Sequence, residues 1–206
     1  MSLSVTLIII GINVVLSLIC FSNQELLNKL IFNPYVISAR RQYYRFISSG
    51  FIHGDMMHLF VNMFVLYNFG EYVEDAYSQV FGSNATFYFL LLYFGSLVIS
   101  IAPSYRKHVD NPNYNALGAS GAVAAVLFAF IMFNPFASLY LMFIPIPIPA
   151  ILVGVGYIAY EWYMGKKGGT NINHDAHLWG AIFGFFFTGL LKPDLFLLFL
   201  EQLIPG

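Results

Sequence analysis

Six long apolar stretches, nearly free of charged side chains, restrict the folds open to this sequence. They lie near residues 3–21, 57–77, 85–102, 117–133, 138–160 and 177–191. A bilayer core of about 30 Å needs about 20 mostly apolar residues per helix, so each stretch is long enough, or nearly so, to cross it. Lipid cannot form hydrogen bonds with the backbone, so a spanning segment must be an α-helix or a strand of a closed barrel. None of the stretches alternates between apolar and polar residues with a period of two, and this excludes barrel strands. We therefore expect an all-α integral membrane protein, a bundle of six transmembrane helices.

Composition and charge agree with a membrane protein. The chain is 59% hydrophobic and 9% charged, whereas about a quarter of an ordinary soluble domain is charged. The net charge of −1 gives no reason to expect nucleic acid as a partner. The high hydrophobic content and low charge instead predict the lipid bilayer as the environment of the chain. Because no interior linker or internal repeat is visible, we expect a single membrane domain over residues 1–206.

A hydroxyl and an imidazole stand out among the few polar groups in the apolar stretches. Ser120 begins the fourth stretch and His177 begins the sixth. Taken singly, each has a structural explanation, because serines in membrane helices commonly bond their own backbone and a histidine often makes one packing hydrogen bond. Together they could be a nucleophile and its base.

Small residues on the same two stretches favour a close approach of these groups. Gly118 and Gly121 flank the serine, and Gly180 and Gly184 follow the histidine by three and seven residues. Helices with small residues at such spacing pack with their backbones close together. This packing would bring the hydroxyl within reach of the imidazole.

Two neutral donors on the second stretch could complete a site for acyl transfer. His58 and Asn62 are four residues apart and so lie on one face of a helix. With the backbone N–H of Ser120, which has no acceptor inside its own helix, they could stabilise a developing oxyanion. The alternative is that Asn62 only joins two helices by a hydrogen bond.

Three motifs resemble those of the rhomboid intramembrane serine proteases, and they occur in the order of that family. They are Gly118-Ala119-Ser120-Gly121, similar to GxSG; Ala176-His177-Leu178-Trp179-Gly180 with Gly184, similar to AHxxGxxxG; and His58-Leu59-Phe60-Val61-Asn62, similar to HxxxN. The resemblance implies a six-helix rhomboid-like fold and a serine endopeptidase that needs no cofactor and no metal. Its expected partners are the transmembrane segments of single-span membrane proteins.

The resemblance also implies a role for individual residues. Ser120 would be the nucleophile and His177 the base of a dyad without an acidic third member, with His58, Asn62 and the Ser120 N–H as the oxyanion hole. Arg45 would belong to an aromatic-arginine signature in the first loop, and Glu74 would brace the helices. The four glycines Gly118, Gly121, Gly180 and Gly184 would support the site.

One position departs from the family pattern. Many relatives have an aromatic ring four residues after the serine that stacks on the catalytic histidine, whereas this chain has Ala124. The sequence leaves open which group orients His177 in its place, and an aromatic residue of a neighbouring helix is one candidate.

Charge placement and the resemblance make opposite predictions for orientation. Eight of the nine lysines and arginines fall in the first, third and fifth loops, and the positive-inside rule would place those loops in the cytoplasm. The resemblance implies a multi-pass protein of a prokaryotic plasma membrane whose active site opens to the extracytoplasmic side. We adopt the second expectation.

Three other functions are open to such a chain. One is a catalytically inactive rhomboid-like protein that binds membrane clients, although such proteins typically lose the serine or the histidine. Another is a metal-dependent protease, but no HExxH motif exists, and His174 and His177 are three residues apart with no glutamate between them. The third is a transporter, which would show polar residues on several spans near the midplane.

Overall fold

The protein is mostly helical, which confirms the predicted class. A computed structural model describes residues 4–140 and 146–204. Its helices are α1 Val5–Ser22, α2 Gln24–Leu30, α3 Pro34–Arg40, α4 Arg45–Ser48, α5 Met56–Phe81, α6 Ala85–His108, α7 Ser120–Phe133, α8 Ala150–Lys167, α9 His174–Leu191 and α10 Asp194–Leu203, with short 3₁₀ turns η1 Ser49–Phe51 and η2 Gly82–Asn84.

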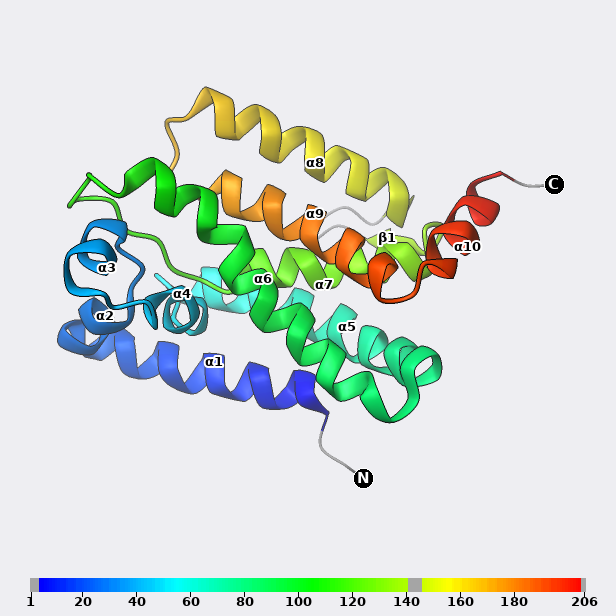
Figure 1. Ribbon diagram of the computed structural model, residues 1–206, viewed down its shortest axis with the longest axis horizontal. Coiled ribbons are helices and arrows are strands. Elements are labelled where there is room, and N and C mark those ends of the chain that lie inside the picture. The colour runs from blue at the N-terminus through cyan, green and yellow to red at the C-terminus, as the bar shows by residue number, and fades with distance from the viewer. Residues whose placement is uncertain (1–3, 141–145, 205–206) are drawn as a thin grey trace.

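Helix α7 forms the centre of the bundle (Figure 1). It packs against α9, α6 and α5, and most of its residues are buried. Helix α9 lies between α7 and α8, whereas α1 packs on α5 at the opposite side of the molecule. The short helices α2, α3 and α4 gather at one end of the bundle, and α10 lies at the other. Helix α7 is therefore enclosed by other helices on several sides.

Length and composition identify fewer membrane spans than the sequence predicted. Two apolar stretches qualify, Val5–Ser22 and Met56–His108, the second of which contains both α5 and α6. A third candidate is the pair α9 and α10, which are bent by 115° relative to each other. Helix α7 has only 14 residues. The count of six spans is thus not confirmed.

The fifth predicted span, 138–160, is wrong over residues 138–140 and 146–149, while residues 141–145 of the same prediction lie outside the described part of the chain. Ser138–Tyr140 forms strand β1 and pairs in antiparallel register with strand β2, Pro147–Pro149. Two alternate prolines in β2 lack the backbone N–H that a helix interior requires, so α8 begins only at Ala150 and continues to Lys167. The helix is shifted toward the C-terminus by about seven residues at its far end, from the predicted 160 to the observed 167. This shift places residue 161 inside a helix.

Polar caps fix where the helices of the site begin. The Asn173 side chain accepts a hydrogen bond from the Ala176 N–H at 3.1 Å, so α9 begins at His174. The Asp55 side chain accepts one from the His58 N–H at 2.8 Å and starts α5. Such caps satisfy N–H groups that have no acceptor within the helix. Both caps lie within four residues of a predicted site histidine.

Glycines bring α7 and α9 into backbone contact. A Cβ atom on Gly180 would collide with the carbonyl group of Gly121, and one on Gly184 would collide with that of Ala125. Gly121 in turn leaves room for the Ser100 side chain of α6, whose Oγ lies where a Cβ would be. Helices α7 and α9 therefore pack as closely as two helices can at these positions.

Candidate active site

Ser120 and His177 lie in direct contact at the start of α7 and near the start of α9. The Ser120 Oγ and the His177 Nε2 are 2.7 Å apart. Both side chains are partly buried, and the His177 side chain is 18% exposed. A hydroxyl at this distance from an unprotonated ring nitrogen can donate its proton when it attacks an electrophile.

A carboxylate binds the other nitrogen of the same imidazole. The Glu161 Oε1 lies 3.0 Å from the His177 Nδ1. Its second oxygen, Oε2, lies 2.5 Å from the Nδ1 of His174, and the His174 Nε2 lies 2.9 Å from the Thr170 Oγ1. The Glu161 and His174 side chains are only 5% and 3% exposed. One chain of hydrogen bonds thus runs from Thr170 to Ser120.

The sequence predicted a dyad without an acidic third member, whereas the structure places the Glu161 carboxylate against His177. Glu161 was not among the predicted site residues, because the predicted fifth span ended at residue 160 and left the glutamate in a loop. In the structure it lies well inside α8, and Gly154, Tyr157 and Glu161 recur at helical spacing on the face that packs inward. A buried acid on the inner face of a largely apolar helix is a signal of function, and the misplaced helix boundary concealed it.

An aromatic residue of α8 lies near the His177 ring. The Tyr157 ring lies roughly parallel to the His177 ring, at 22°, with a centroid separation of 6.5 Å. This is near the outer limit for an aromatic pair. Helix α8 therefore supplies both a nearby ring and a carboxylate to the histidine.

The predicted oxyanion donors lie on α5, close to the turn that leads into α7. The His58 ring fits against Gly118, where a Cβ would lie 2.8 Å from the His58 Nε2. Gly118 has a φ of 113°, a conformation that side chains disfavour. The Asn62 Nδ2 donates to the His58 carbonyl oxygen of its own helix at 2.9 Å. For neither side chain does the described part of the chain show a direct bond to Ser120.

A second histidine, His53, supports this turn and was not predicted. It is fully buried, and its Nε2 accepts a hydrogen bond from the Ala119 N–H at 3.4 Å. Its Nδ1 lies 3.0 Å from the Ser17 Oγ of α1, and its ring packs edge-on against His58 at 4.9 Å between centroids. Burial lowers the pKa of His53 to about 3. His53 is therefore neutral at physiological pH.

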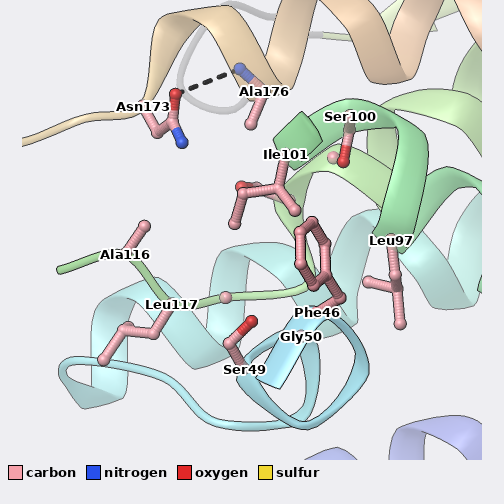
Figure 2. A pocket seen from close by; sticks show the side chains of 13 residues that line it. Phe46, Ser49, Gly50, Leu97, Ser100, Ile101, Ala116, Leu117, Asn173 and Ala176 are labelled. Atoms are coloured by element: carbon pink, nitrogen blue, oxygen red, sulfur yellow. Dashed lines mark hydrogen bonds between the residues drawn. The ribbon is translucent and has the colours of Figure 1, made fainter. Parts of the chain in front are cut away.

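Ser120 is one of the residues that line a small cavity of about 20 Å³. Figure 2 shows Ser49, Ser100 and Asn173 around the same cavity. Ser49, Ser100 and Asn173 contribute polar atoms to its lining. The Asn173 Nδ2 is buried and has no hydrogen-bond partner among the described residues. The volume suits one water molecule, which would give this amide a partner beside Ser120.

Arg45 and Glu74 lie apart from the reacting groups. The Arg45 guanidinium is buried and donates to the carbonyl oxygens of Asn28 and Ile31 at 2.8 and 2.6 Å. The Glu74 carboxylate on α5 accepts a hydrogen bond from the Thr6 N–H at 3.1 Å, near the start of α1. The contacts of both residues join separate segments of the chain.

The ligand types at the site would also suit a metal ion. Glu161, His174 and His177 offer ligand atoms that all lie within 4.8 Å of one another, and two imidazoles with one carboxylate are a common zinc ligand set. However, hydrogen bonds among these three residues, Thr170 and Ser120 already account for all four ring nitrogens and both carboxylate oxygens.

The chain belongs to the rhomboid family, since the Rhomboid domain model matches residues 40–193. It is 31% identical over 169 residues to RHOMBOID-like protein 12, mitochondrial, of Arabidopsis thaliana, a match that covers 78% of this chain and 50% of that protein. It is 31% identical over 142 residues to the human presenilin-associated rhomboid-like protein, mitochondrial, covering 68% of this chain and 36% of the relative. The chain thus spans half or less of the length of these relatives.

The expected prokaryotic plasma membrane is contradicted by these comparisons. The relatives come from a plant and from animals, and both carry the word mitochondrial in their names. The sequence carried no signal for this, because motifs shared across a family report the chemistry of a site and not the membrane that contains it.

Proposed function

We propose that this protein is an intramembrane serine endopeptidase that cleaves transmembrane segments of single-span membrane proteins. The proposal rests on one observation, the 2.7 Å contact between the Ser120 Oγ and the His177 Nε2 inside an apolar helical bundle. Membership of the rhomboid family supports it. The names of the relatives favour a mitochondrial membrane as its location.

Six helices would cross the bilayer in this proposal: α1, α5, α6, α7, α8 and α9. Helix α7 has 14 residues and is therefore about 21 Å long, shorter than a bilayer core of about 30 Å. Its neighbours shield it from lipid, so it does not need the full length. Ser120, at its first residue, would then lie below the membrane surface, at a depth where a transmembrane substrate can reach it.

The reaction would be acyl transfer in two stages. The His177 Nε2 accepts the hydroxyl proton while the Ser120 Oγ bonds to the peptide carbonyl carbon, and the electron pair of the carbonyl moves onto its oxygen. Collapse of this intermediate breaks the C–N bond, and the imidazolium gives its proton to the leaving amine. A water molecule deprotonated by His177 then attacks the acyl carbon. The ester bond breaks, and the proton returns to Ser120.

The surroundings of Ser120 suit both stages. Its N–H is at the first position of α7, where the helix dipole favours a negative charge. His58 and Asn62 would contribute further donors once a substrate is bound. The cavity lined by Ser49, Ser100 and Asn173 would keep a water molecule near the acyl-enzyme.

Replacement of Ser120 tests the proposal. Ser120→Ala should abolish cleavage of a single-span reporter reconstituted in liposomes, because no other group replaces the nucleophile. An alkyl fluorophosphonate should label the wild type and not the variant. Ser96→Ala is the matched control, since the Ser96 Oγ only donates to the Tyr93 carbonyl of its own helix, at 2.7 Å, and should leave both readouts unchanged.

The alternative is an inactive rhomboid-like protein that binds membrane clients. It would bind the reporter without cutting it, and the probe would label neither protein. Equal labelling of the wild type and Ser120→Ala would remove Ser120 from the mechanism.

A further inference from the structure

The catalytic histidine proposed above has a partner on α8 that the family motifs do not contain. The motifs around Ser120, His177 and His58 belong to α7, α9 and α5. Glu161 lies on a fourth helix, and its Oε1 is 3.0 Å from the His177 Nδ1. We infer that Glu161 is a positioning residue, the carboxylate that fixes the orientation and tautomer of His177 and so makes a Ser-His-Glu triad.

Proton positions along the hydrogen-bond chain agree with this role. An ionised carboxylate can only accept hydrogen bonds, so the ring nitrogens that face it, Nδ1 of His177 and Nδ1 of His174, must carry the protons. The His177 Nε2 is then left without a proton and faces the Ser120 hydroxyl at 2.7 Å. This is the tautomer that a general base requires.

His174 and Thr170 hold the glutamate in place. The Glu161 Oε2 accepts from the His174 Nδ1, and the His174 Nε2 accepts in turn from the Thr170 Oγ1. Each carboxylate oxygen is therefore engaged by a different imidazole. A carboxylate held at both oxygens cannot rotate away from His177 without breaking a buried hydrogen bond, which is costly in a medium without water.

Two further features require such a partner. Ala124 leaves His177 without a ring on α7, and Tyr157 lies 6.5 Å away between centroids, too distant to fix the imidazole by itself. During the reaction the imidazole becomes positively charged in an apolar surrounding, where charge is disfavoured. The adjacent carboxylate compensates for that charge.

Glu161→Gln tests the inference, which rests on the proposed function. The measurement is inactivation by an alkyl fluorophosphonate, in which the Ser120 Oγ bonds to phosphorus, fluoride leaves and the hydroxyl proton passes to His177. The maximal rate reports activation of the serine, and the half-saturating concentration reports docking of the probe. We expect the maximal rate to fall about 100-fold, with a half-saturating concentration within about twofold of the wild type.

Two further variants separate positioning from a structural role. Glu161→Asp keeps the negative charge and should recover at least about tenfold of the rate lost in Glu161→Gln. Glu74→Gln makes the same change at a carboxylate that joins α5 to α1. It should lower the thermal midpoint and leave the maximal rate unchanged.

Several outcomes would overturn the inference. An unchanged maximal rate in Glu161→Gln would do so. Equal losses of maximal rate in Glu161→Gln and Glu161→Asp, in proportion to their losses in thermal midpoint, would do so too. Loss of wild-type labelling on treatment with a chelator, with recovery on addition of zinc, would show that the cluster holds a metal ion instead. If the wild type itself is not labelled, the proposed function fails first, and the two failures are thereby distinguished.

Discussion

The His58 ring lies against Gly118, two residues before Ser120, and Asn62 lies one turn further along α5. Neither the His58 nor the Asn62 side chain forms a hydrogen bond with Ser120 in the described residues, so we expect both to act mainly once an oxyanion has formed. His58→Ala and Asn62→Ala should each lower kcat for a transmembrane reporter by about 10- to 100-fold, with KM little changed. A raised KM at unchanged kcat would instead assign them to substrate docking.

At the scale of single residues, the sequence predicted the groups that belong to short local motifs. Ser120, His177, His58 and Asn62 are each marked by neighbours a few positions away, and the structure brings their helices together. Glu161 has no such neighbours. Whether Glu161 lies in a helix or in a loop depends on where α8 begins. The prolines of β2 and the pairing of β2 with β1 determine that boundary, and the hydropathy pattern alone does not show it.

At the scale of helices, the contact of α7 with α9 depends on the absence of side chains. Gly180→Ala would place a methyl group against the Gly121 carbonyl, and the backbones cannot separate without moving Ser120 from His177. We expect a loss of about 1–3 kcal/mol of stability, measured as a lower midpoint of thermal unfolding in detergent, together with slower probe labelling.

Gly156→Ala is the control for this prediction. Gly156 lies on α8, and a Cβ there would meet nothing within 4 Å. Alanine favours a helix over glycine, so stability should be unchanged or slightly higher. Equal effects of the two substitutions would mean that the contact between α7 and α9 tolerates an extra methyl group.

The helices themselves were predictable where an apolar stretch coincides with a single helix. The bounds of α1, α7 and α9 lie within three residues of the predicted ones, because most positions of these helices are apolar, whether they are buried or not. The structure extends α5 and α6 beyond the predicted ends, through polar residues near their C-termini. The short helices α2, α3, α4 and α10 were not predicted, since each has too few residues to show a clear helical period.

At the scale of the whole molecule, the buried histidine His53 makes folding sensitive to acid. Its pKa is about 3 in the folded protein and about 6.5 in an unfolded chain. Between these values the unfolded chain binds a proton that the folded protein excludes. The contribution of neutral His53 to the free energy of unfolding is therefore complete above pH ~6.5 and is lost as the pH falls from there toward ~3.

Acidification should reveal this dependence in thermal unfolding. Lowering the pH from about 7.5 to about 5 should cost roughly 2 kcal/mol through His53 alone. His53→Asn should be less stable at neutral pH, because it disturbs the bonds to Ser17 and Ala119, and should lose less on acidification. A variant with the same pH dependence as the wild type would show that other groups are responsible.

Helix α8 has a peculiar position in this molecule. It lies at the edge of the bundle (Figure 1), and an apolar groove of about 680 Å³ runs between it and the helices α7, α9 and α10. Its one buried charged side chain, Glu161, lies 3.0 Å from the Nδ1 of His177, the proposed base. An outward swing of α8 that admits a peptide from the lipid would thus withdraw the carboxylate at the same moment. With α8 displaced outward, the protein would not cleave. A bound peptide would be cut only after α8 had returned, so a peptide that dissociates sooner would leave uncut.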